Sequence, residues 1–183
     1  GLTTTALVLF AVVALIPGAA PAQGQAPLEM TFVDATPNQS AAIHDKMRSV
    51  IERSNDINFT NPSDFLYNAQ RFDVTLDTLA SAQKRKSQKE LIRRTMRANQ
   101  LETIVIYKRQ NNKLHLILLG PSGAQLKHYR SPIRQPTIND KQAVAVLKKI
   151  FKVVVPKVRQ FRQNNPNAGQ SNPQPPPDQQ TSS

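Results

Sequence analysis

The sequence predicts an α/β (α+β) domain in which helices pack on a mixed sheet. Three segments carry this prediction: a strand followed by a helix at 28–54, two strand-forming runs joined by a turn at 103–120, and a long amphipathic helix at 140–162. The chain has 183 residues, which is long enough for one domain with its own hydrophobic core. We therefore expect the order strand, helix, helix, three-stranded antiparallel meander and long C-terminal helix.

The first strand is predicted at 28–35, where apolar residues alternate onto one face. The turn at 36–38 leads into a helix that runs to about Ser54, with Asn38 or Ser40 as its N-terminal cap. The strand residues that share a face are Leu28, Met30 and Phe32. The apolar stripe of the helix consists of Ile43, Met47, Val50 and Ile51.

The pattern between this helix and the meander is less regular. Residues 55–63 are polar and predict a loop, in which Phe59 can enter a short edge strand. Residues 63–83 leave the secondary structure open, although Ser63-Asp64 is suited to cap a short helix. A helix is predicted from Lys84 to Gln100, and its apolar side consists of Leu91, Ile92 and Met96.

Residues 103–130 predict a meander of three antiparallel strands. Two β-rich runs, 103–108 and 113–120, flank the turn Gln110-Asn111-Asn112. A second tight turn at 121–123, in which Gly123 is free to take a positive φ, leads to the third strand at 124–130. The middle strand should be the most buried, because Leu116 to Leu119 is apolar on both faces.

The C-terminal part begins with a loop at 131–137 that contains two prolines. Asn139 or Asp140 then caps the final helix, and Pro156 should kink or end it because proline lacks a backbone donor. Residues 163–183 are rich in Pro, Gln and Asn and hold no large apolar side chain, so they predict a disordered tail. The apolar stripe of the helix consists of Ala143, Leu147, Ile150, Phe151, Val154, Val158 and Phe161.

Residues 1–22 have the pattern of a secretory signal peptide. They carry no charge, and the apolar run at 7–16 is followed by Pro17-Gly18 and by an Ala20-Pro21-Ala22 cleavage site. We therefore expect cleavage near Ala22-Gln23, a linker at 23–27, and a periplasmic or secreted domain at 28–162. The alternative is that residues 3–22 remain uncleaved and anchor the protein in the inner membrane, although the apolar run is about half as long as a spanning helix needs.

Three segments resemble the N-terminal α/β domain of the periplasmic translocation protein TolB and related bacterial envelope proteins. Leu28–Asp34 is similar to the opening strand of that domain, 101–106 to its strand after a helix, and 116–123 to its hairpin. The chain departs from the family at Tyr107, where the family has Gly, and at Gly120, where it has Asp. The resemblance covers about 28–161, without the β-propeller of TolB. It implies a fold, an envelope setting and a role in protein–protein assembly rather than catalysis.

Motifs for catalysis and metal binding are missing from the sequence. The chain has no cysteine, which excludes disulfides, thiol catalysis and thiolate metal sites. Of its three histidines, His44, His115 and His128, only the last two are expected to be close, and two imidazoles are too few for a zinc site. No serine lies in a Gly-x-Ser-x-Gly elbow, and the densest acids, Asp64, Asp73 and Asp77, form no glycosidase pair. We expect no enzyme activity, cofactor or metal.

Excess positive charge is the strongest remaining signal. The chain has 24 Lys and Arg against 12 Asp and Glu, a net charge of +12, which attracts polyanions and acidic surfaces. Six cations decorate the last helix: Lys148, Lys149, Lys152, Lys157, Arg159 and Arg162. The residues that we predict to contact a partner or polyanion are Lys84, Arg85, Lys86, Lys89, Arg93, Arg94, Arg97, Tyr107, Lys113, Lys127 and Arg130.

The sequence leaves several functions open. The first is a non-enzymatic envelope protein that binds other envelope proteins in an assembly. The alternative is a basic protein that binds a polyanion, namely lipopolysaccharide, anionic lipid, a wall polymer or extracellular nucleic acid. An enzyme with an irregular site, a wall protein with the tail as a spacer, and a basic surface that is merely solvated also remain open. The oligomeric state stays undetermined.

Overall fold

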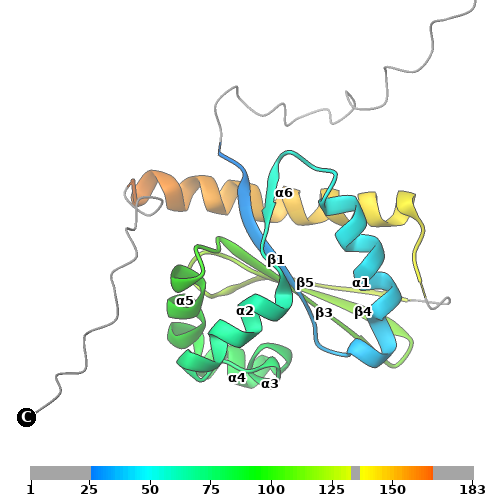
Figure 1. Ribbon diagram of the computed structural model, residues 1–183, viewed down its shortest axis with the longest axis horizontal. Coiled ribbons are helices and arrows are strands. Elements are labelled where there is room, and N and C mark those ends of the chain that lie inside the picture. The colour runs from blue at the N-terminus through cyan, green and yellow to red at the C-terminus, as the bar shows by residue number, and fades with distance from the viewer. Residues whose placement is uncertain (1–25, 133–136, 167–183) are drawn as a thin grey trace, which may run out of the picture.

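The computed structural model describes residues 26–132 and 137–166. In this part of the chain, five strands form one mixed sheet with helices on both sides, which confirms the predicted fold class (Figure 1). The strands are β1 (Leu28–Asp34), β2 (Ile57–Phe59), β3 (Thr103–Gln110), β4 (Lys113–Leu119) and β5 (Gln125–Pro132). The helices are α1 (Pro37–Ile51), α2 (Pro62–Ala69), the 3₁₀ turn η1 (Gln70–Phe72), α3 (Leu76–Ala80), α4 (Ala82–Ser87), α5 (Lys89–Ala98) and α6 (Asp140–Asn164).

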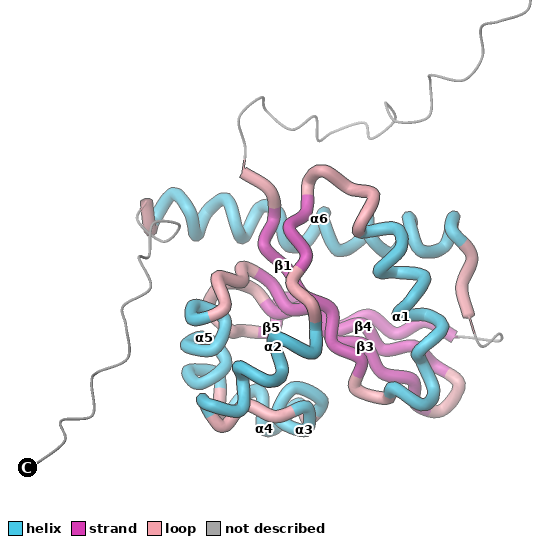
Figure 2. The backbone as a smooth tube through the Cα atoms, in the orientation of Figure 1, coloured by secondary structure: helices cyan, strands magenta, loops and turns pink. Residues whose placement is uncertain are grey.

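The strand order is β2-β1-β3-β4-β5. β1 pairs in parallel with β2 and with β3, whereas β3, β4 and β5 form the predicted antiparallel meander. The two parallel connections need crossovers. The first crossover is α1, which lies on one face of the sheet, and the second runs from α2 to α5 on the other face (Figure 2).

Both faces of the sheet are therefore covered around its central strands β1 and β3. Phe32 and Val105 pack with α1 and α6, and Val33 and Ile106 pack with α2, α3 and α5. A strand that is covered on both sides reads as a continuous apolar run, which is why Ile104 to Tyr107 are all buried.

Helix α6 closes the face that α1 begins. Asn139 caps it together with Gln142, as predicted. The helix does not end at Pro156, which corrects one of the two predicted outcomes. Val154 and Val158 are buried on either side of this residue, so packing against the sheet outweighs the one hydrogen bond that proline removes.

The side chain of Arg162 connects the two ends of the domain. Arg162 near the end of α6 donates to both carboxylate oxygens of Glu102 at 2.6 Å. The same guanidinium donates to the carbonyl oxygens of Ala26 and Pro27, at 2.9 and 2.7 Å. The last two residues of the predicted linker are thus held against α6. The predictions for the leader, for 23–25 and for most of the tail lie outside the described residues.

Several predicted element boundaries are wrong. The helix predicted at 84–100 is two helices, because Gln88 leaves helical geometry at φ −106° and ψ 22°. Helix α1 begins at Pro37, so neither Asn38 nor Ser40 caps it. Ser40 is instead buried and donates to Asp34. Helix α2 is capped by Asn61, whose side chain accepts from the Ser63 amide at 2.9 Å, while the short edge strand at Phe59 is confirmed as β2.

Candidate interaction surface

Positive charge is concentrated in the second half of the chain. Residues 1–102 hold 11 Lys and Arg against 10 Asp and Glu, whereas residues 103–183 hold 13 against 2. The meander from 103 to 132 contains five Lys and Arg, two His and no acidic residue. Most of the net charge of the protein therefore comes from residues 103–183, which include the meander and α6.

Strand β5 is the long edge of the sheet. It has eight residues and ends the strand order, and within residues 26–132 and 137–166 no strand pairs with its outer side. Its side chains are exposed or half-buried along the whole strand. Lys127 is exposed, and its Nζ lies 5.9 Å from the centre of the Tyr129 ring. The outer backbone groups of β5 are thus available next to cationic side chains.

The two meander histidines meet, as the sequence predicts. Nδ1 of His115 lies 3.0 Å from Nε2 of His128. His115 is directly opposite Lys108 on β3 and Arg130 on β5. Burial, and then the charges of Lys108, Arg130 and Lys113, lower the pKa of His115 below its ordinary value. Burial, and then Arg130, His115, Arg85 and Lys108, lower the pKa of His128 in the same way.

A second group of exposed cations lies on the outer side of helix α6. Lys141, Lys148 and Lys152 are exposed and are spaced by seven and four residues, which places them on one side of the helix over about 16 Å. Lys149 is exposed next to them, whereas Ile150 and Val154 on the opposite side are buried. This side of α6 is a straight cationic stripe.

Two of the predicted contact residues are buried, which corrects the predicted surface. Arg85 is 5% exposed and donates to the Leu79 carbonyl at 2.5 Å and to Gln125 at 3.0 Å. Burial lowers its pKa. Tyr107 is 1% exposed, because it lies under α1 and contacts the rings of Phe32 and His44. Neither side chain is free to touch a partner.

The other predicted cations of the 84–97 segment are partly neutralised by acids. Lys84 pairs with Asp77. Arg93 and Arg94 pair with Glu90 at 2.5 and 3.3 Å, and Arg93 holds the pKa of Glu90 at about 2. Among the described residues, three exposed cations of this segment have no ion-pair partner: Lys86, Lys89 and Arg97. The meander also exposes three cations, Lys113, Lys127 and Arg130, and its residues 103–132 include no acid to pair with them.

The polar atoms buried under α1 form no hydrolytic site. Tyr107 Oη and His44 Nε2 are buried and make no hydrogen bond with any described residue. Burial raises the pKa of Tyr107 far above its ordinary value, so the phenol stays neutral. Ser40 is fully buried and donates to Asp34 and to the Thr36 carbonyl, so its hydroxyl ties the first turn of α1 to the end of β1.

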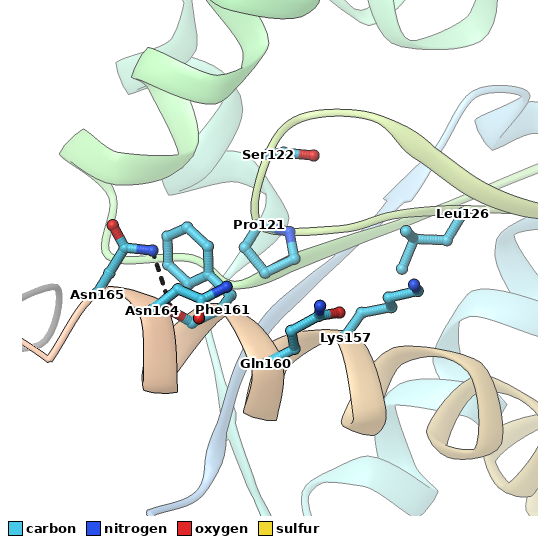
Figure 3. A pocket seen from close by; sticks show the side chains of 8 residues that line it. All are labelled: Pro121, Ser122, Leu126, Lys157, Gln160, Phe161, Asn164 and Asn165. Atoms are coloured by element: carbon cyan, nitrogen blue, oxygen red, sulfur yellow. Dashed lines mark hydrogen bonds between the residues drawn. The ribbon is translucent and has the colours of Figure 1, made fainter.

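A shallow groove of about 220 Å³ lies between the β4–β5 turn and the end of α6 (Figure 3). Its walls combine the apolar side chains of Pro121 and Phe161 with amides and with one cation, Lys157. It contains no acid or histidine, so it offers no acid–base pair. In the described part of the chain, no group of three or more His, Asp or Glu is arranged to hold a metal ion.

Comparisons with known proteins add no assignment. Neither a family model, nor a curated protein, nor a solved structure matches this chain. The resemblance to the TolB N-terminal domain therefore stays a prediction. Within the described ranges, no helix has the length and apolar character needed to cross a membrane.

The sequence alone did not place Lys108 beside the two histidines, although it lies directly opposite His115. The residues predicted to contact a partner or polyanion do not include Lys108. A two-residue turn at Asn111 and Asn112, both with positive φ, would have placed Lys108 opposite His115.

Proposed function

We propose that this protein is an exported, non-enzymatic bacterial envelope protein that acts as an interaction module in an assembly, and that its partner docks on β5. The observation that carries the proposal is the eight-residue edge strand with exposed cations beside its unpaired outer side. The uncharged leader and the resemblance to envelope proteins support the envelope setting.

Strand addition is the recognition mode that fits this surface. A partner segment that adds to an edge strand gains main-chain hydrogen bonds, and its side chains provide specificity. Lys127 lies on β5 itself and Lys113 on the neighbouring strand β4, and both are exposed. These cations favour an acidic segment. They also repel a second copy of β5, since charged side chains on an edge strand oppose self-association.

A second candidate function is polyanion binding, which the cationic stripe of α6 favours. Lys141, Lys148 and Lys152 follow one side of this helix. A straight row of exposed cations attracts an anionic polymer or surface through counterion release, and the binding weakens steeply with salt. The two functions use different surfaces and are therefore separable.

The test is co-purification from crosslinked envelopes with charge-reversal variants of residues 23–183. We expect Lys127→Glu to lower recovery of the partner protein about tenfold, which corresponds to about 1.4 kcal/mol, because a like charge now faces the acidic segment. The matched control, Lys148→Glu with Lys152→Glu, should leave this recovery unchanged. If the α6 variant abolishes recovery and Lys127→Glu does not, the β5 proposal is wrong. Loss of heparin retention by the α6 variant alone would support the second candidate.

A further inference from the structure

Four basic side chains gather on one face of the meander, away from the outer backbone of β5. Lys108, His115 and Arg130 are direct cross-strand neighbours on β3, β4 and β5. His128 lies opposite Ile117 on the same face, one step along the strand, and reaches His115 at 3.0 Å. We call these four residues the basic row: Lys108, His115, His128 and Arg130.

Protonation of His115 carries an electrostatic cost that nothing on the meander offsets. Like charges on directly opposite strand positions destabilise a sheet, and the meander contains no Asp or Glu. The charged groups that act on the two imidazoles come from β3, β4, β5 and α4, and all of them are basic: Lys108, Lys113, Arg130 and Arg85. An anion in the row would relieve this repulsion.

The composition of the row matches one kind of anion. Arginine offers a planar fork for two oxygens, lysine a point charge, and the histidine pair the ring N–H that is not used between the two rings. A tetrahedral phosphate group presents several oxygens to such donors. A metal ion would need more than two imidazoles and meets only positive charge here. From this juxtaposition we infer that the basic row binds a single phosphate group, either as a free phosphate compound or as the headgroup of a lipid.

The test is an NMR titration of the histidine ring protons with inorganic phosphate, against chloride at equal ionic strength. A bound anion stabilises imidazolium, so phosphate should raise the apparent pKa of His115 and His128 by on the order of one unit. His44 serves as the internal reference, because it lies in α1 on the opposite side of the sheet. If phosphate and chloride give the same pKa for His115 and the same pKa for His128, the inference is wrong.

Charge-neutralising variants distinguish phosphate binding at the basic row from nonspecific attraction to a positively charged protein. Arg130→Gln and Lys108→Gln should each lower phosphate affinity about tenfold, while Lys149→Gln, which removes an exposed charge from α6, should leave it unchanged. Equal losses in all three variants would show nonspecific attraction and contradict the proposal. Thermal unfolding of each variant, followed by circular dichroism and compared with that of the unchanged protein, checks that the variant is folded.

A second arm identifies the source of the phosphate. Flotation with vesicles of phosphatidic acid, which carry a phosphomonoester, is compared with flotation with phosphatidylcholine vesicles. Binding that Arg130→Gln abolishes assigns the lipid headgroup, and phosphate binding without flotation assigns a free phosphate compound. The inference does not rest on the proposed function. Lys127, the residue that tests strand addition, lies opposite Leu118 on the other face of the sheet, so either proposal can fail alone.

Discussion

Replacing Gly123 with alanine is expected to lower the free energy of unfolding by about 3 kcal/mol. Gly123 lies in the β4–β5 turn at φ +72°, a conformation that side chains rarely adopt. A Cβ atom there would lie 2.7 Å from the Lys89 carbonyl oxygen and 3.0 Å from the Arg93 nitrogen. Both contacts are with the backbone of α5, so the turn or the helix would have to move.

The measurement is urea denaturation followed by circular dichroism, with Gly120→Ala as the matched control in the same turn. A Cβ at Gly120 would meet the side chain of Leu126 at 2.9–3.0 Å, and a half-buried leucine can adjust. The control should therefore lose about 1 kcal/mol. Equal stability of the two variants would contradict the close packing of this turn on α5.

Replacing Phe65 with alanine is expected to cost about 3–5 kcal/mol. Phe65 lies in α2, is fully buried, and belongs to the apolar cluster that includes Val33, Ile104 and Ile106. Its removal leaves a cavity between the sheet and the helical layer that covers its second face. The variant therefore tests the segment that the sequence pattern left open.

Tyr67 provides the control for this experiment, because it lies two residues along the same helix and is 67% exposed. Tyr67→Ala should change the free energy of unfolding by no more than about 0.5 kcal/mol. The two midpoints are compared by urea denaturation at equal protein concentration. Similar losses in both variants would show that α2 does not pack on the sheet as described.

The long periodic segments of the fold could be predicted because their patterns are local. Strand β1, helix α1, the meander and α6 each bury one regular stripe or run. The region from 62 to 82 could not be assigned, since α2 and α3 have only eight and five residues, and tertiary packing rather than periodicity stabilises such short helices. The break at Gln88 was hidden because its neighbours are good helix formers.

The candidate surface could be predicted only in part. Its sign and its location on the meander follow from composition, but the exposure of single residues depends on tertiary contacts. Tyr107 is buried because α1 covers its face of the sheet, and Arg85 is buried because α4 turns it toward Leu79 and Gln125. The cross-strand neighbours of His128 also depend on the register shift at Leu118 and Leu119, which no sequence pattern indicated.

The most direct test of the proposed role is a scan with a photoreactive amino acid in the intact chain. It is placed at Lys127 and Ser131 on β5, at Lys148 on α6, and at Arg53 after α1, all of which are exposed. If the partner docks on β5, the two β5 positions give an adduct with one discrete envelope protein and the other two positions give none. Adducts of equal yield from Lys148 or Arg53, or none from β5, would contradict docking on β5.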